Sequence, residues 1–311
     1  MRGDGTYINV AISRWTNVNC SIRMKAVCVA LPLVLRFLSL ISISMKKILK
    51  LVLSVCISGV FTTASADESV CPKDGKFPVA ELKTRVLVIG ETHGSNEYPA
   101  FAKSVVCQLL AANKPVILGL EIPENEQVAI NRYLQSNGSA DDRRVLQQGK
   151  FWKSKIQDGR SSVAMFGLIE TVRKLKQSGQ KVLLAAFDIS ADYEPVPLEK
   201  NEAYARGRRD GEMTLNIIDR IRQYPEYTYV ALVGSYHAGR GKNYPNNPDY
   251  SPMAYLLSQR EPIQTVYLSD QGGEYWVCRK PGGELVCGPY TYPASKNKVS
   301  AEDDFSIELG K

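Results

Sequence analysis

Hydrophobic residues gather in five short segments of the chain, each bounded by polar or turn-forming residues. Valine, isoleucine, leucine and alanine dominate these segments, and their shortness favours buried strands over helices. The predicted strands are residues 85–90, 115–120, 181–187, 227–233 and 265–268.

Between these strands, apolar residues recur every three to four positions, which is the period of an amphipathic helix. The predicted helices are residues 97–113, 124–135, 163–177 and 201–223. Strands that alternate with helices predict an α/β fold, here a single layered domain (residues 67–311) with a mainly parallel sheet flanked by helices. Residues 141–160 are polar with two aromatic residues, and we expect them to form a helical insertion over the cleft.

Two further strand-like segments lie on either side of a Pro-Gly-Gly turn and carry Cys278 and Cys287. This pattern predicts a C-terminal β-hairpin closed by a disulfide. Of the four cysteines beyond residue 66, Cys71 and Cys107 then remain, and we expect them to join the N-terminal segment to the first helix. No Cys-x-x-Cys occurs, which argues against a redox-active pair.

Residues 45–66 predict that the protein is exported. Two lysines precede an apolar run, and Ala64-Ser65-Ala66 forms a small-residue cleavage site, the pattern of a signal peptide. The run is shorter than the roughly 20 apolar residues of a membrane-spanning helix. Lipid anchoring at Cys56 is the weaker alternative, because Val55 stands where a small residue is required. We therefore expect a periplasmic or secreted protein with no stable membrane span in the mature chain.

Residues 1–44 precede the internal Met45 and show no helical or strand period in their polar part. A signal peptide that begins at Met45 indicates that this residue is the true start and that residues 1–44 belong to an over-extended reading frame. A second apolar stretch, residues 26–44, leaves a tandem membrane segment as the alternative.

The formal charge of +7 is confined to the presequence. Residues 1–66 hold eight basic residues and one acidic residue, whereas the rest of the chain holds 31 of each. A neutral domain presents no electrostatic footprint for nucleic acid or for an anionic membrane surface. We expect a small-molecule, peptide or haem ligand instead.

Titratable residues come directly after four of the predicted strands. They are Glu91 with His93, Glu121, Asp188, and His237, and the chain has no other histidine. The carboxyl ends of parallel strands meet at one edge of a sheet, where ligands bind. Each acidic residue alone is explained by a helix cap or a salt bridge, but the joint pattern indicates a functional site.

Four motifs resemble, in order, those of the erythromycin esterase/ChaN-like/Tiki-TraB superfamily. They are Val88-Ile89-Gly90-Glu91-Thr92-His93-Gly94, Gly119-Leu120-Glu121-Ile122-Pro123, Arg209-Asp210-Gly211-Glu212-Met213-Thr214-Leu215-Asn216 and Gly234-Ser235-Tyr236-His237. The resemblance covers about residues 85–240 and implies a compact α/β fold with a Glu/His cleft. Its members include hydrolases in which a histidine activates water, metal-dependent peptidases, and haem binders of the ChaN type. This sequence is most similar to the ChaN-like bacterial branch in size and export.

The resemblance assigns the site to Glu91, His93, Glu121 and His237. We expect an exported hydrolase that activates water against an ester or amide bond. In this hypothesis His93 is the general base, Glu121 orients the base or the water, and His237 or Arg209 stabilises the oxyanion. Glu91 is either a base or a cap of the next helix. The residues expected to bind substrate are Arg209, Asp188 and Tyr236.

Two alternatives stay open. The two imidazoles and two carboxylates would also suit a divalent metal such as zinc, manganese or iron, although no spacing demands it. A haem- or iron-binding protein of the ChaN type without catalysis is the other alternative, since tyrosines could line a flat ligand or ligate haem iron. The tyrosines near the proposed cleft are Tyr98, Tyr236, Tyr244, Tyr250 and Tyr255. The absence of a Gly-x-Ser-x-Gly elbow and of a Gly-x-Gly-x-x-Gly loop argues against a serine hydrolase and a dinucleotide enzyme.

N-terminal sequencing of the exported protein is expected to read from Asp67, because cleavage follows the Ala64-Ser65-Ala66 site. A chain expressed from Met45 serves as the control and is expected to give the same mature protein. A mature N-terminus before Met45 would contradict this interpretation.

Overall fold

The computed structural model describes residues 70–72, 77–155, 157–189, 202–241, 250–269, 272–294 and 304–308. All of them belong to one compact unit, Ala64–Lys311. The predicted presequence lies outside the described residues, as do residues 242–249. Among the helices of the described part, none has the length and apolar character needed to cross a membrane.

The predicted α/β fold is confirmed. Six strands form one sheet in the order β3-β2-β4-β1-β5-β8, and every neighbouring pair is parallel. The strands are β1 (Val86–Glu91), β2 (Val116–Pro123), β3 (Val182–Asp188), β4 (Thr228–Gly234), β5 (Gln264–Ser269) and β8 (Phe305–Glu308). The order places β4 between β1 and β2, so the ends of β1, β4, β2 and β3 lie next to one another.

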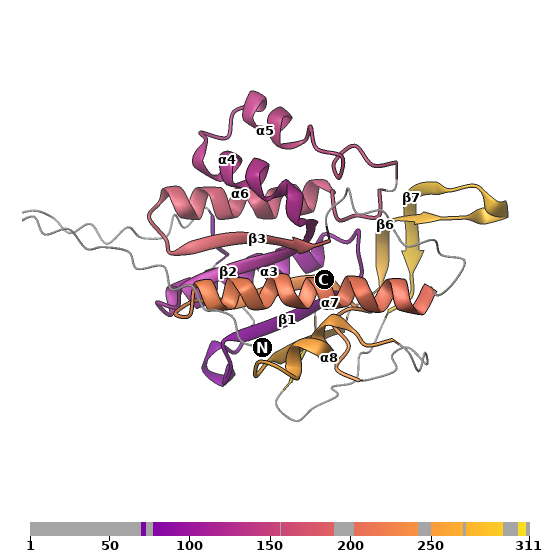
Figure 1. Ribbon diagram of the computed structural model, residues 1–311. Coiled ribbons are helices and arrows are strands. Elements are labelled where there is room, and N and C mark those ends of the chain that lie inside the picture. Colours follow the sequence, from indigo (N-terminus) through magenta and orange to yellow (C-terminus); the bar gives the residue numbers. More distant parts are fainter. Residues whose placement is uncertain are drawn as a thin grey trace, which may run out of the picture. The chain divides into compact units, whose positions relative to one another are not determined.

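Helices cover both faces of the sheet (Figure 1). One face packs against α3 (Glu97–Ala111), α4 (Gln127–Gln135) and α6 (Val163–Gln177), and the other against α7 (Glu202–Gln223) and α8 (Met253–Ser258). Successive side chains of β1 point to opposite faces of the sheet, so the strand packs against both helix layers. Leu87 and Ile89 contact the layer of α3, α4 and α6, and Val86 and Val88 contact that of α7 and α8. Burial of these apolar faces is the main contribution to folding.

The segment expected to be a helical insertion contains one regular α-helix, α5 (Ala140–Leu146), followed by turns up to Ser162. The side chain of Ser139 accepts the amide N–H of Asp142, and the Asp142 carboxylate accepts the Ser139 N–H, so a capping box starts α5. The predicted helix 124–135 begins as a 3-10 turn, η3 (Glu124–Glu126), and a second such turn, η2 (Val79–Glu81), precedes β1.

The hydrophobic pattern of the sequence predicts no strand after the hairpin, but residues 305–308 form β8, which pairs with β5 in parallel. The Asp304 carboxylate accepts the amide N–H of Thr265 (2.9 Å) and a hydrogen bond from Arg240 (2.7 Å), and the ring of Phe305 packs on Phe77. These contacts come from residues 39 or more positions away, which a local hydrophobic pattern does not reveal.

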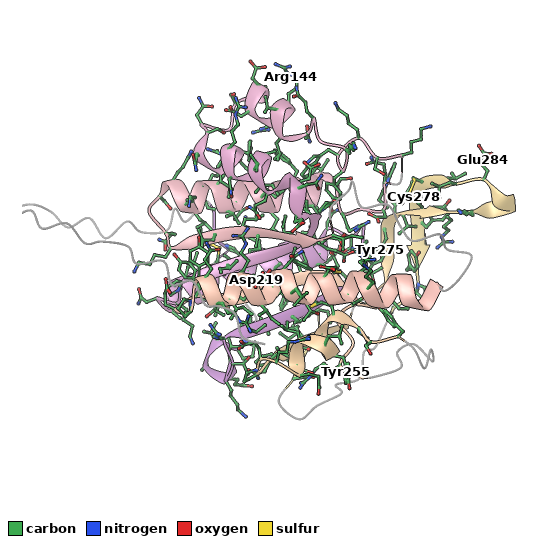
Figure 2. The ribbon with its side chains drawn as sticks, viewed as in Figure 1. Arg144, Asp219, Tyr255, Tyr275, Cys278 and Glu284 are labelled. Carbon is green, nitrogen blue, oxygen red and sulfur yellow. A yellow bond between two sulfur atoms is a disulfide. The ribbon has the colours of Figure 1, made fainter. Side chains whose placement is uncertain are left out.

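The predicted hairpin consists of β6 (Gly273–Arg279) and β7 (Val286–Tyr292), joined through η4 (Pro281–Gly283). It projects from the body of the domain, with Cys278 and Glu284 labelled on it (Figure 2). The amide N–H of Trp276 donates to the carbonyl of Gly94, which has φ +89°. A side chain at residue 94 would collide with the Trp276 backbone, so Gly94 allows the hairpin to contact the loop that carries His93.

Both predicted disulfides are confirmed, Cys71–Cys107 and Cys278–Cys287. The first joins the segment before the sheet to α3, and the second links directly paired residues of the hairpin. Disulfides persist in oxidising compartments, so both agree with a secreted or periplasmic protein.

Replacement of both Cys71 and Cys107 by serine is expected to lower the free energy of unfolding by about 4 kcal/mol, because this disulfide closes a long loop with a sequence separation of 36. Urea unfolding measures the change. The matched control is the double serine variant of Cys278 and Cys287, whose separation of 9 predicts a smaller loss, of about 2.5 kcal/mol. A larger loss in the control would contradict the loop-length explanation.

Candidate active site

The two histidines lie in one cavity at the carboxyl ends of β1 and β4. The cavity has a volume of about 320 Å³. Its lining is polar and charged, and it comprises Glu91, Thr92, His93, Glu121, Asp158, Arg160, Arg209, Gly234, Ser235, Tyr236 and His237. A parallel sheet therefore brings together residues that lie more than 140 positions apart in the sequence.

His93 lies between two carboxylates. Its Nδ1 is 2.9 Å from Oε1 of Glu91, and its Nε2 is 3.5 Å from Oε2 of Glu121. Burial alone would lower the pKa of His93, but the charge of Glu121 and the hydrogen bonds with Glu121 and Glu91 raise it to about 10. Since carboxylates only accept hydrogen bonds, both ring nitrogens carry protons and His93 is a cation at neutral pH.

His237 has different partners. Its Nδ1 lies 2.8 Å from Oδ1 of Asp210, and its Nε2 lies 3.4 Å from Nη1 of Arg209. The same Nε2 is 3.9 Å from Oε1 of Glu121. A guanidinium group can only donate, so Nε2 is the acceptor and the proton of a neutral ring sits on Nδ1. His237 thus has a lone pair where His93 has an N–H.

Glu121 holds the charged groups together. Its Oε1 accepts hydrogen bonds from Arg209 (2.6 Å) and Arg160 (3.0 Å), and its Oε2 accepts the amide N–H of Gly234 (2.8 Å). Burial would raise the pKa of this carboxyl, but the charges of His93, Arg160 and Arg209 hold it well below its usual range. Glu121 is therefore an anion with every nearby donor directed at it.

The two arginines share a second carboxylate. Asp188 is buried and accepts hydrogen bonds from Nε and Nη2 of Arg209 and from Nη1 of Arg160. The side chain of Asp158 binds the other edge of Arg160 at 2.7 to 3.1 Å. Burial would lower the pKa of each guanidinium group, but Glu121 and Asp158 raise that of Arg160, and Glu121 and Asp188 raise that of Arg209. Both arginines therefore stay charged.

Close packing at Gly234 fixes the distance between the two histidine loops. A Cβ built on Gly234 would lie 2.9 Å from Nε2 of His93 and 3.4 Å from Oε2 of Glu121. Any larger residue would displace the imidazole. The amide N–H of this glycine also binds Glu121, so it contributes a donor that needs no side chain.

A bound metal fits these residues poorly. Both nitrogens of His93 face carboxylates, Nδ1 of His237 faces Asp210, and two arginine cations contact Glu121. Within the described part of the chain, no group of three or more His, Cys, Asp or Glu side chains is arranged to hold a metal ion. The metal interpretation stays a prediction that this arrangement does not favour, because cations already occupy the places around the carboxylates.

The structure brings together the residues that the sequence singled out. Glu91, His93, Glu121, Arg209, Tyr236 and His237 line the cavity, and Asp188 binds Arg209 beside it. Tyr236 is 57% exposed. Glu91 contacts His93, and the described bonds at the start of α3 contain no side-chain cap from it, so the interpretation of Glu91 as a helix cap loses support.

Sequence reasoning missed Asp158, Arg160 and Asp210. Asp158 and Arg160 lie in the segment in which no chemistry was recognised. A signal did exist for Asp210, because it precedes Met213, Ile217 and Ile221 on the buried face of α7. A carboxylate on an apolar helix face indicates a buried partner.

The tyrosines that the structure describes do not gather around the cavity. Tyr98 belongs to α3 and is buried in the core, and Tyr250 donates a hydrogen bond to Asp210. Tyr244 lies outside the described residues, and Tyr236 is the one tyrosine among the residues that line the cavity. A tyrosine-lined slot for a flat ligand is therefore not part of the described site.

Solved structures with a similar fold were found, although the sequence alone has no match. No protein-family model and no curated protein matches the sequence. A mutant of erythromycin esterase EreC in its open conformation aligns with a TM-score of 0.53 and 13% identity, over 70% of this chain and 78% of that one. ChaN of Campylobacter jejuni, described with cofacial haem, aligns at a TM-score of 0.35 and 14% identity, over 60% and 82% of the two chains.

The alignment with EreC covers most of both chains. The resemblance read from the four motifs is thereby confirmed at the level of fold. The chain has the α/β fold of erythromycin esterase EreC.

Proposed function

We propose that the protein is a hydrolase that uses His237 to activate water against an ester or amide bond of a small polar substrate. The observation that carries this proposal is the difference in partners between the two imidazoles: Nε2 of His93 faces the Glu121 carboxylate, and Nε2 of His237 faces the Arg209 guanidinium. One ring offers an acceptor to the cavity, and the other offers a donor. Hydrolysis requires a base that takes a proton from water and a donor that stabilises the charge on the substrate oxygen, and two groups in different environments can supply both.

The roles follow from the contacts. Nη1 of Arg209 turns from Nε2 of His237 to the substrate carbonyl oxygen, which frees the Nε2 lone pair. Nε2 then accepts a proton from water as the water oxygen bonds to the carbonyl carbon. The resulting oxyanion is stabilised by Nη1 of Arg209 and the Nε2–H of His93, both of which carry positive charge near the cavity. The proton then passes to the leaving oxygen or nitrogen as the old bond breaks. His237 therefore takes the role of general base that the resemblance of the motifs had assigned to His93.

The cavity supports a polar substrate. Its eleven lining residues include one aromatic ring and no large aliphatic side chain. Sites for large flat or apolar ligands are lined mainly by hydrophobic and aromatic groups. This chemistry favours a small polar ester or amide over haem.

Hydrolysis is tested with a panel of p-nitrophenyl esters and short peptide amides. His237→Ala is expected to lower kcat by about 10²- to 10⁴-fold on the best of them, because the general base is lost. His93→Gln is expected to lower kcat with less effect on KM, because the donor acts on the developing charge. Arg144→Gln, on the exposed α5 (Figure 2), is the matched control and should leave kcat unchanged.

The outcome that contradicts the proposal is specific. Wild-type protein that hydrolyses nothing in the panel, but gives a Soret band on haem titration that His93→Gln or His237→Ala abolishes, is a haem binder. Undiminished turnover by His237→Ala would reject His237 as the base.

The protonation of His93 predicts a pH dependence. Between pH 7 and 9 its ring is expected to keep both protons, because its pKa in the folded protein is about 10. NMR of ¹⁵N-labelled imidazoles measures this directly, with only two histidines to assign. A His93 that loses a proton near pH 6.5 would contradict the two-carboxylate environment.

Stability gives an independent check of the same prediction. His93 of the folded protein keeps a proton that the unfolded chain releases near pH 6.5. The stability that this proton contributes is complete below pH 6.5 and is lost as the pH rises through about 10. The free energy of unfolding is therefore expected to fall over this window, by up to about 1.4 kcal/mol per pH unit. The His93→Gln variant should lack that slope.

A further inference from the structure

We propose that Asp210 is a positioning residue, which fixes His237 with its proton on Nδ1 and its Nε2 lone pair toward the cavity. This inference rests on the proposed function, since it explains how the base is prepared. It concerns a residue outside the cavity, because Asp210 is fully buried and is not among the residues that line it.

Three donors converge on the Asp210 carboxylate. Oδ1 lies 2.8 Å from Nδ1 of His237 and accepts the amide N–H of Met253 at 2.6 Å, while Oδ2 accepts the hydroxyl of Tyr250 at 3.2 Å. His237 lies in the loop after β4, Met253 is the first residue of α8, and Tyr250 lies just before that helix. A carboxylate only accepts hydrogen bonds, so Asp210 receives all three of these donors, the Nδ1–H of His237 included.

Both ring nitrogens of His237 are constrained independently. Asp210 can only accept, so Nδ1 must carry a proton, and Arg209 can only donate, so Nε2 must present its lone pair. Neighbouring residues of one turn of α7 therefore specify the two ends of the same imidazole. With the proton on Nε2 instead, an acceptor of the ring would face the Asp210 carboxylate and a donor would face Arg209.

Hydrogen bonds also fix the backbone of Asp210 and of His237. The hydroxyl of Thr214 donates to the Asp210 carbonyl at 2.7 Å, and the amide N–H of Ala254 donates to the His237 carbonyl at 2.9 Å. Since Met253 binds the Asp210 carboxylate, consecutive residues at the start of α8 contact both members of the pair. α7, α8 and the β4 loop thus fix the His237–Asp210 distance without using a cavity residue other than His237.

The test separates charge, tautomer and folding. Asp210→Asn keeps the size of the side chain and an oxygen acceptor but removes the charge, and it is expected to lower kcat by at least about tenfold with KM nearly unchanged. Asp210→Ala removes the acceptor, so NMR of its ¹⁵N-labelled imidazoles should show His237 with protons distributed between Nδ1 and Nε2. Asp219→Asn, an exposed carboxylate on the same helix (Figure 2), is the control and should change neither quantity.

Each result decides the matter. A single Nδ1–H form of His237 in the wild type that becomes mixed in Asp210→Ala supports the assignment, and so does a loss in kcat alone for Asp210→Asn. Unchanged kcat per folded Asp210→Asn molecule, or a wild-type His237 with its proton on Nε2, would overturn it. If Asp210→Ala does not fold, the kinetics of Asp210→Asn and the wild-type tautomer decide. A wild type without any turnover would reject the proposed function, while the tautomer measurement still tests Asp210.

Discussion

The site depends on the ionised carboxylate of Glu121. It is buried, and an isolated charge in such a position would be strongly destabilising. Arg160, Arg209, His93 and the Gly234 amide supply the compensating donors. These groups come from four different parts of the chain, so one anion at the end of β2 sets where the loops after β1 and β4, the turn at Arg160 and helix α7 meet. Removing the anion would leave two arginines facing each other beside a histidine cation.

The asymmetry of the two histidines is a consequence of this network. His93 has a carboxylate at each nitrogen, whereas His237 has a carboxylate at one nitrogen and a guanidinium at the other. The sequence alone makes the two residues look equivalent, since each follows a strand and a glycine. Only the identity of their partners separates a ring with a carboxylate at each nitrogen from one whose Nε2 faces a donor, which is how one site can contain both a donor and an acceptor of protons.

The amino-acid sequence was sufficient to predict the features of the fold and of the site that depend on a local pattern of residues. The strand ends at Glu91, Glu121 and Asp188 were predictable because a parallel sheet aligns its carboxyl ends, and the disulfides followed from count and spacing. Arg160 was not predictable in the same way, because it reaches Glu121 from a turn whose path over the sheet is set by tertiary contacts. β8 was missed since a four-residue strand is recognisable only beside its neighbour.

The same network limits what the cavity can do. Nearly all of its charged groups are engaged with one another, so a ligand has to replace one of the two long contacts: Nε2 of His237 with Nη1 of Arg209 (3.4 Å) or Nε2 of His93 with Glu121 (3.5 Å). One acceptor beside charged donors is suited to deprotonate water and to stabilise an oxyanion, and it offers little to a metal ion that needs several free lone pairs. Folds of this kind carry several activities, so the function has to be argued from these atoms, and they favour hydrolysis.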